Sequence, residues 1–160
     1  GCGDEVLLVH CACEGEYVIR QATQEDMPRI IDMAVRFNAE TSYRNFIDVT
    51  PERVAQSFET ITKDPNSVIL VSGSDGAVTG MIVMMICPHP FSGERISYEV
   101  VWWVDPESRG DGVKLLRAAE KFSKDSGVKK MHMIAPNDKV GHFYERLGYT
   151  QVEVAYQRSL

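Results

Sequence analysis

The most informative part of the sequence is Glu99-Val-Val-Trp-Trp-Val-Asp-Pro-Glu-Ser-Arg-Gly-Asp-Gly112. A β-rich run here passes into a turn with two glycines, and apolar residues at helical spacing follow. Glycines let the backbone approach an anion closely, and the unpaired amides at a helix start point toward it. The stretch therefore predicts a phosphate cradle. Many strand-to-helix turns contain glycines for steric reasons alone, so this motif by itself is weak evidence.

Hydrophobic periodicity around this stretch predicts the order of the remaining elements. Before it we expect a strand at Tyr17–Gln21, helices that start at Gln24 and Pro51, and strands at 67–72, 77–87 and 95–104. After it we expect a helix at 113–122, a strand at 128–135, a helix at 138–147 and a closing strand at 149–156. Two packed layers, with helices on a mixed central sheet, satisfy this order.

The length of 160 residues suits one domain with one sizeable core. We place this domain at residues 17–160 and treat residues 1–16 as an N-terminal appendage. His10, Cys11 and Cys13 in the appendage offer three metal ligands, but no second cluster completes a tetrahedral site. We therefore expect no metal.

Charge and hydropathy disfavour several classes of partner. The net charge is −6 and no basic cluster is longer than Lys129–Lys130, which disfavours a nucleic-acid partner. The longest apolar run, Met81–Cys87, is far short of the roughly 18 residues of a membrane span. The first residues also lack the positive charge and apolar length of a signal peptide. We expect a cytoplasmic protein, and a homodimer remains open.

A second motif lies near the C-terminus, in the segment Asn137–Tyr149. Asn137 is expected at the end of a strand, and Tyr144 about two turns into the next helix. A phenol in that position can face the neighbouring strand ends. Taken alone, Tyr144 is better explained as a core tyrosine.

Together these segments resemble the GNAT acetyltransferase superfamily from Tyr17 to the end of the chain. Residues 17–28 resemble the opening strand and helix start of the family, Val104–Gly112 its pyrophosphate-binding motif, and Asn137–Tyr149 its last helix and strand. The resemblance implies an α/β (α+β) fold: a GNAT-type mixed central β-sheet, mostly antiparallel, flanked by about four helices.

The motif departs from the family pattern Q/R-x-x-G-x-G/A at one position. Arg109 and Gly112 fit this pattern, but Lys114 occupies the final small-residue position. Counting back from the helix instead makes Gly110 and Gly112 the two glycines and places Glu107 at the Q/R position. Both counts hold if the loop is about two residues shorter than usual.

The resemblance implies direct transfer of an acetyl group from acetyl-CoA, a co-substrate, to a primary amine. Glu99 would be the general base and Tyr144 the general acid, while backbone amides at the end of the strand would bind the thioester carbonyl. The implied cofactor-binding residues are Trp103, Val104, Asp105, Arg109, Gly110, Asp111, Gly112, Val113 and Asn137.

Other interpretations of these residues remain open. Glu99 would face solvent in a regularly alternating strand, and His132 on the next strand is a second candidate base. A catalytically idle GNAT-fold binding or assembly module is the alternative function. A nucleotide-binding protein is disfavoured, because the chain lacks G-x-x-x-x-G-K-[ST]. The acceptor is expected to be a small-molecule or peptide amine, and the candidate residues to line its cleft are Tyr43, Phe46 and Phe91.

Overall fold

The computed structural model describes residues 17–74 and 76–160. The appendage of residues 1–16, with the potential metal ligands His10, Cys11 and Cys13, lies outside the described residues.

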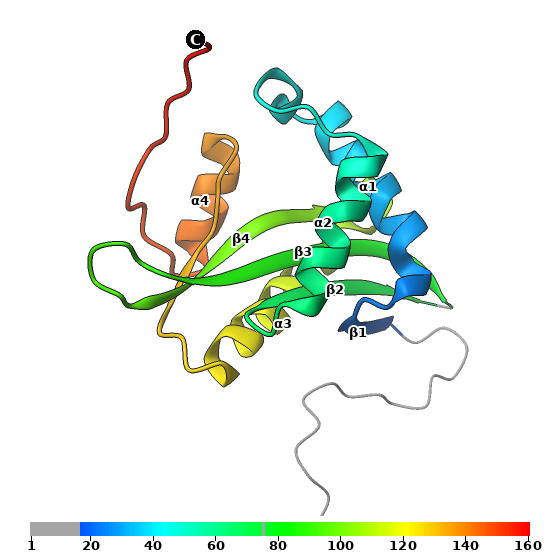
Figure 1. Ribbon diagram of the computed structural model, residues 1–160, viewed down its shortest axis with the longest axis horizontal. Helices are drawn as coiled ribbons and strands as arrows, with labels where there is room; N and C mark the ends of the chain where they lie inside the picture. The colour runs from blue at the N-terminus through cyan, green and yellow to red at the C-terminus, as the bar shows by residue number, and fades with distance from the viewer. Residues whose placement is uncertain (1–16, 75) are drawn as a thin grey trace, which may run out of the picture.

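The core of the fold is a five-stranded sheet in which neighbouring strands are consecutive in the chain (Figure 1). The strands are β1 (Tyr17–Gln21), β2 (Ser67–Ser74), β3 (Ala77–Pro88), β4 (Arg95–Val104) and β5 (Lys130–His132). The pairs from β1 to β4 are antiparallel, and β4 pairs with β5 in parallel. The expected mixed, mostly antiparallel sheet is therefore confirmed.

In the described residues four α-helices flank the sheet, as expected: α1 (Met27–Glu40), α2 (Pro51–Lys63), α3 (Gly112–Asp125) and α4 (Asp138–Arg146). Figure 1 shows α1 and α2 on the near face of the sheet and α3 behind it. Three short 3-10 helices, η1 (Gln24–Asp26), η2 (Ser42–Asn45) and η3 (Pro106–Asp111), precede α1, α2 and α3. Thr50 is the N-cap of α2: its hydroxyl accepts a hydrogen bond from the Arg53 amide, and Pro51 occupies the first turn of the helix.

Alternation along β3 divides the core into two clusters. Met81 and Val83 pack with α1 and α2 residues, whereas Ile82 and Met84 pack against α3. The paired strand β4 follows the same rule, so Trp103 is buried on the α1 side and Trp102 lies on the α3 side. The two indoles thus face opposite sides of the sheet, as their positions in sequence require.

The C-terminal part of the sheet is shorter than the sequence indicates. Only Lys130–His132 of the expected strand at 128–135 pairs with β4, and the closing strand at 149–156 does not form. A strand needs a partner for its backbone groups, and residues 150–160 make no backbone–backbone hydrogen bond with any described residue. The prediction of a closing strand at 149–156 is therefore wrong for the described structure, because alternation alone supplies no partner for the backbone.

None of the helices in the described part of the chain is long and apolar enough to cross a membrane.

Candidate active site

The candidate site begins where β4 and β5 separate. Their ladder ends at the pair Tyr98 and His132, so no strand of the described part of the chain lies beside the edge of β4 beyond Tyr98. The Asp105 amide donates to Thr79 on β3, and backbone groups alternate between the two edges of a strand. Val104 therefore presents its amide and carbonyl to the open edge, where its carbonyl accepts from Arg109 Nε at 3.4 Å.

A β-bulge at Val100 sets the direction of Glu99. The partner of Val83 is Val101, but the partner of Met84 is Glu99, so Val100 is an extra residue on β4. Because paired residues share a face of the sheet, the bulge turns Glu99 to the side of Met84 and α3. Regular alternation would have placed Glu99 on the face of Val101 and Trp103.

Glu99 is partly buried and has no basic partner among the described residues. Its Oε2 atom accepts from the Ile134 amide at 2.8 Å. Desolvation disfavours the ionised carboxylate and raises the pKa of Glu99 from 4.5 to about 7, while the Ile134 hydrogen bond opposes this shift. At neutral pH the carboxyl therefore exchanges readily between its two forms.

Tyr144 contacts the same residue as Glu99, namely Ile134. Its hydroxyl donates to the Ile134 carbonyl at 3.3 Å, and its ring stacks on Trp102 with a centroid separation of 6.1 Å. Burial is the main cause that raises the pKa of Tyr144 above its ordinary value, and the negative charge of Glu99 adds to it. The phenol therefore keeps its proton at neutral pH. The two residues with predicted catalytic roles are thus held at opposite polar groups of one peptide segment.

The three predicted substrate residues are not gathered in one place. Tyr43 packs on Phe37 with ring centroids 4.8 Å apart, and burial, with a smaller contribution from the charge of Glu99, raises the pKa of Tyr43. Phe46 follows η2 and is half exposed. Phe91 lies in the β3–β4 connection, is 98% exposed and contacts His89, so its role at the cleft stays a prediction.

The expected phosphate cradle is a 3-10 helix that leads directly into α3. The Gly112 amide donates to the Arg109 carbonyl, so the turn uses one amide that the sequence suggested for phosphate binding. A Cβ atom at Gly112 would lie 3.3 Å from the Trp102 ring, which gives this glycine a packing reason. At Gly110 a Cβ atom would meet nothing within 4 Å, so the backbone there is open to a ligand.

The departure at Lys114 also has a structural account. Its ammonium lies 4.5 Å from the centroid of the Tyr17 ring and 3.5 Å from Asp111 Oδ1. The Tyr17 hydroxyl in turn donates to the Asp111 carbonyl. Lys114 and Tyr17 therefore fasten the end of the loop to β1. Val113, the next predicted cofactor contact, is partly buried in the first turn of α3.

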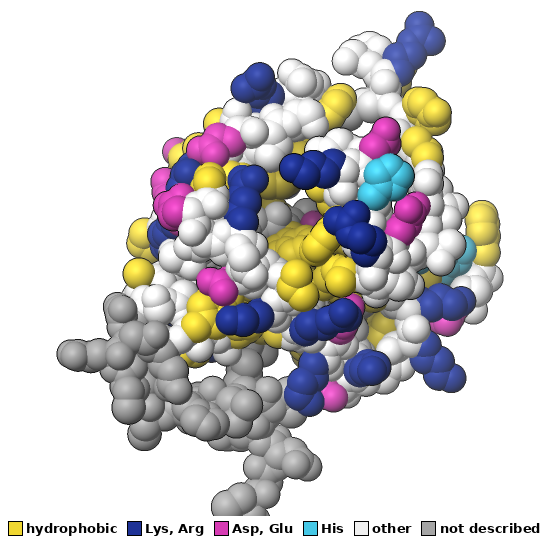
Figure 2. Space-filling view, turned by 180° about the vertical axis from the view of Figure 1, so that it is seen from behind, with side chains coloured by type: hydrophobic (Ala, Val, Ile, Leu, Met, Phe, Trp, Pro, Cys, Tyr) yellow, Lys and Arg dark blue, Asp and Glu magenta, His cyan; other side chains and the backbone are white. Residues whose placement is uncertain are grey.

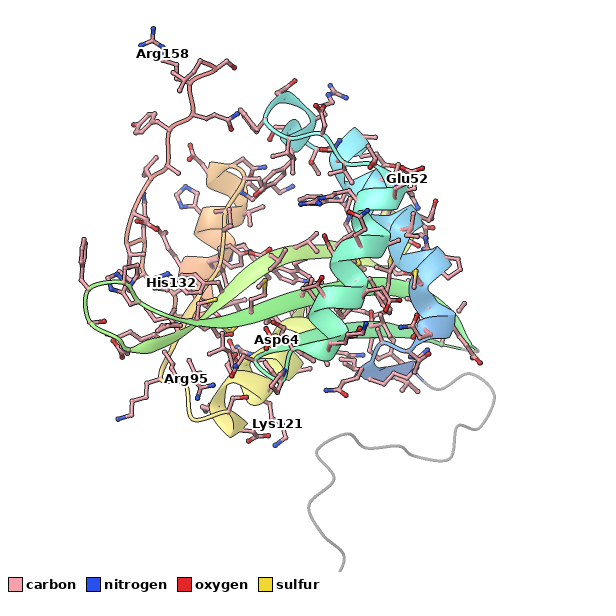
Figure 3. All side chains as sticks on the ribbon, in the orientation of Figure 1. Glu52, Asp64, Arg95, Lys121, His132 and Arg158 are labelled. Atoms are coloured by element: carbon pink, nitrogen blue, oxygen red, sulfur yellow. The ribbon has the colours of Figure 1, made fainter. Side chains whose placement is uncertain are left out.

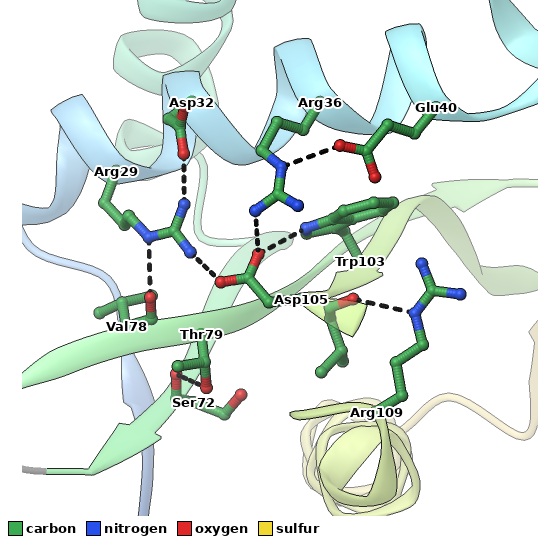
Figure 4. Close-up of polar contacts among 11 residues, drawn as sticks. Arg29, Asp32, Arg36, Glu40, Ser72, Val78, Thr79, Trp103, Asp105 and Arg109 are labelled. Carbon is green, nitrogen blue, oxygen red and sulfur yellow. Dashed lines mark hydrogen bonds and ion pairs between the residues drawn. The ribbon is translucent and has the colours of Figure 1, made fainter. Parts of the chain in front are cut away.

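Asp105 belongs to a buried cluster of charges on the α1 side of the sheet (Figure 4). Its carboxylate forms ion pairs with Arg29 and Arg36 and accepts from Trp103 Nε1 at 3.1 Å. Its amide donates to Thr79, and its carbonyl accepts from Ser108. All polar groups of Asp105 are therefore engaged by the chain itself, and contact with a cofactor stays a prediction.

Two further candidates have structural partners. Asn137 caps α4, because its side chain accepts from the Val140 amide at 3.1 Å. His132, the second candidate base, lies on β5 (Figure 3), and its ring meets Tyr98 edge-on at 5.1 Å. In the described part of the chain, no group of three His, Cys, Asp or Glu side chains is arranged to hold a metal ion.

Sequence reasoning missed Ile134 and the position of Trp102. Ile134 contributes only backbone groups, which carry no signal in the residue type. The Trp102 Nε1 atom is buried without a hydrogen-bond partner among the described residues, beside Gly112 and Tyr144. A buried unpaired donor is rare, and its presence next to the loop marks a place where a ligand acceptor would be favourable.

The surface around the loop suits a ligand with an apolar arm and phosphate groups. Figure 2 shows the side opposite to Figure 1, with a central hollow whose floor is apolar and whose border carries Lys and Arg side chains. Arg109 is exposed and forms no ion pair with a described residue. The open Gly110 backbone, Arg109 and the unpaired Trp102 donor fit coenzyme A chemistry.

Comparison with solved structures supports the same fold. A transcriptional regulator from Bacillus halodurans C-125 matches with a TM-score of 0.74 and 20% identity, covering 91% of this chain and 100% of that chain. Glucosamine-6-phosphate N-acetyltransferase from Arabidopsis thaliana matches with a TM-score of 0.71 and 19% identity, covering 90% of this chain and 98% of that chain. AAC(6')-Iy in complex with a bisubstrate analogue, CoA-S-monomethyl-acetylneamine, matches with a TM-score of 0.74 and 15% identity. The match covers 91% of this chain and 99% of that chain.

The family assignment rests on the sequence itself. No curated protein matches the chain significantly. The sequence model of the acetyltransferase (GNAT) family matches residues 17–149, which include the sheet, all four helices and the loop before α3. The chain therefore belongs to the GNAT family of acetyltransferases.

Proposed function

We propose that this protein is an acetyl-CoA-dependent N-acetyltransferase that acts on a primary amine of a small molecule or peptide by direct attack. The observation that supports this proposal best is the meeting of Glu99 and Tyr144 at Ile134. A carboxyl group with a pKa of about 7 and a protonated phenol lie on the same peptide segment, beside an unpaired strand edge. Acetyl transfer to an amine needs one group of each kind.

Glu99 is the general base of this mechanism. A substrate amine reaches the site as an ammonium ion, and it must lose a proton before it attacks. A base is most effective when its pKa is close to the ambient pH, and Glu99 meets this condition because it is desolvated without a cation beside it. The proton passes from the amine nitrogen to Glu99, directly or through one water.

Tyr144 is the general acid. Acetyl-CoA supplies the acetyl group as a thioester; a C–N bond forms, the C–S bond breaks and the leaving thiolate takes a proton. Tyr144 carries that proton, since its raised pKa keeps the phenol protonated. The Val104 amide at the open edge of β4 is the donor for the developing oxyanion.

The proposal also includes the groups that hold the co-substrate. Arg109 provides positive charge for the pyrophosphate, and the exposed Gly110 backbone allows its close approach. Trp102 Nε1 is a donor for the arm that reaches from the loop toward Tyr144. Tyr43 and Phe46 border the acceptor side. Solved neighbours in complex with sisomicin and with an acetylneamine analogue make small-molecule amines the first acceptors to screen.

One observation favours a second candidate, a catalytically idle module of the same fold. The 3-10 turn before α3 uses the Gly112 amide internally, so the short loop offers fewer donors to a pyrophosphate. Such a module would keep the hollow but bind acetyl-CoA weakly or not at all. Binding of acetyl-CoA therefore separates the two proposals.

The decisive experiment is calorimetric titration with acetyl-CoA of the intact protein and of Gly110→Glu. Gly110 is chosen because a side chain there meets no protein atom, so the fold is kept while a carboxylate repels the phosphates. We expect micromolar binding by the intact protein and at least about a tenfold loss in Gly110→Glu, about 1.4 kcal/mol. Gln56→Glu on the exposed side of α2 adds the same charge and should bind normally. No binding by the intact protein would favour the idle module.

A further inference from the structure

The Trp103 indole is shared by two arginines from different parts of the chain. Trp103 is buried on the α1 side of the sheet and is only 4% exposed. The guanidinium carbons of Arg36 on α1 and of Arg109 in the loop before α3 lie 5.6 Å and 5.3 Å from the centroid of its ring. Both separations are within cation–π range. The indole therefore brings Arg109, the candidate phosphate-binding residue, next to a second cation, Arg36 (Figure 4).

The two arginines differ in their anionic partners. Arg36 Nη1 donates to Asp105 Oδ1 at 3.1 Å, and Arg36 Nε donates to Glu40 Oε1 at 3.0 Å. Arg109 donates only through Nε, to the Val104 carbonyl, and its terminal N–H groups have no partner among the described residues. Arg109, unlike Arg36, is therefore available to an external anion.

Asp105 is the carboxylate to which Arg109 would otherwise be drawn. Trp103 Nε1 donates to Asp105 Oδ1 at 3.1 Å, so this oxygen lies at the edge of the ring that both arginines contact. Arg36 engages Oδ1, and Arg29 engages Oδ2. The carboxylate is buried, and a buried charge attracts an unpaired cation strongly because solvent screens it weakly. Occupation of Oδ1 by Arg36 removes this attraction.

We propose that Arg36 is a positioning residue: it keeps Arg109 unpaired by occupying Asp105, so that the free guanidinium can bind the pyrophosphate of the co-substrate. The step to co-substrate binding rests on the proposed function. Trp103 attracts the Arg109 cation without accepting its terminal N–H groups as a carboxylate would. Those groups keep the planar fork that matches the oxygens of a phosphate.

Arg29 offers a matched comparison for Arg36. It also pairs with Asp105 from α1, but it lies over no aromatic ring of the described residues, and its Nε donates to the Val78 carbonyl at 2.8 Å. A purely structural role, in which the two arginines only neutralise Asp105, would make them equivalent. In the proposed arrangement they differ, because only Arg36 occupies the oxygen beside the ring that holds Arg109.

The first test measures the reactivity of Arg109 without any ligand. Phenylglyoxal modifies guanidinium groups, and an arginine paired with a carboxylate reacts more slowly than a free one. Mass spectrometry of the peptide that contains Arg109 gives its rate. We expect this rate to fall several-fold in Arg36→Met, to recover in Arg36→Lys, which retains a cation for Asp105, and to be unchanged in Arg29→Met. Arg36→Gln replaces Arg36→Met if thermal unfolding shows that the latter is not folded.

The second test is calorimetric titration with acetyl-CoA in a double-mutant cycle. Arg36→Met and Arg109→Met should each raise Kd by about tenfold, the effect of losing one charged hydrogen bond. The double variant should bind as Arg109→Met does, because Arg36 acts only through Arg109. Arg29→Met should bind normally. Additive losses in the double variant would overturn the inference, since Arg36 would then act independently of Arg109.

The two tests separate this inference from the proposed function. A protein that binds no acetyl-CoA would contradict the proposed function, whereas the phenylglyoxal rates need no ligand. Equal rates for Arg109 in the intact protein and in Arg36→Met would overturn the inference whether or not acetyl-CoA binds. Equal slowing in Arg29→Met and Arg36→Met would also overturn it, because neutralisation of Asp105 alone would then explain the effect.

Discussion

Glu99 lies in the middle of β4 and Asp105 directly follows the end of this strand, and the surroundings of the two carboxylates are opposite. Asp105 is buried against Arg29, Arg36 and the Trp103 indole, and each of its oxygens has a charged or polar donor. Glu99 is desolvated and has, among the described residues, one backbone donor and no cation beside it. A buried carboxylate with partners fixes structure, whereas one without a cation is free to change protonation. The chemical role of a carboxylate therefore depends on the groups that face its side chain.

The largest expected effect is on catalysis, from Glu99→Gln. The amide keeps the shape of Glu99 but takes no proton, so kcat/KM should fall by roughly 10²–10⁴. The rate of thiol release with an accepted amine is the measurement. In the intact protein kcat/KM should rise with pH through about 7, because only the ionised Glu99 acts as a base.

The matched control for this variant is Glu94→Gln. Glu94 pairs with Lys130 in the segment before β4, away from Ile134, and its replacement should leave the rate and pH profile unchanged. A Glu99→Gln enzyme with full activity and the same inflection near pH 7 would remove Glu99 from the mechanism and leave His132 as the next base to examine.

A smaller but still large effect is expected on stability, from Asp105→Asn. The substitution leaves two guanidinium groups beside a neutral side chain in a buried position, which typically costs about 3–5 kcal/mol. Urea unfolding followed by tryptophan fluorescence measures this loss. Asp32→Asn removes an exposed partner of the same Arg29 and should cost at most about 1 kcal/mol. Equal losses in the two variants would mean that burial of Asp105 contributes little.

Much of this fold could be predicted from sequence, because it depends on local patterns. Apolar periodicity placed β4 at Arg95–Val104, and Pro51 marked the start of α2. The family resemblance selected Glu99 and Tyr144, and the structure brings them together at Ile134. Their catalytic roles are still proposals.

The features that sequence did not indicate depend on contacts between distant segments. The bulge at Val100 follows from the register of β4 on β3, and neither strand alone contains it. The partners of Asp105 come from α1, far away in the chain. Residues 149–156 show the opposite case: their alternation predicted a strand, but no strand forms there. Local preference predicts an element, but pairing decides whether it joins the sheet.

The smallest of the expected effects concerns the pH dependence of stability, again at Glu99. Its folded pKa of about 7 lies above the ordinary value of 4.5, so between these pH values the folded state binds more protons than the unfolded state. Ionisation of Glu99 therefore destabilises the fold progressively as pH rises, by about 3 kcal/mol once pH exceeds 7.

Glu99→Gln removes this penalty, because the amide does not ionise. Relative to the intact protein, the variant should be similar in stability near pH 4.5 and more stable by up to about 3 kcal/mol at pH 8. Urea unfolding at several pH values measures the difference, with Glu94→Gln as the control that should show no such gain. A constant difference across this range would mean that Glu99 is ionised throughout, as a solvated carboxylate would be. Such a result would remove the contrast with Asp105, because both carboxylates would then be charged in the folded protein at neutral pH.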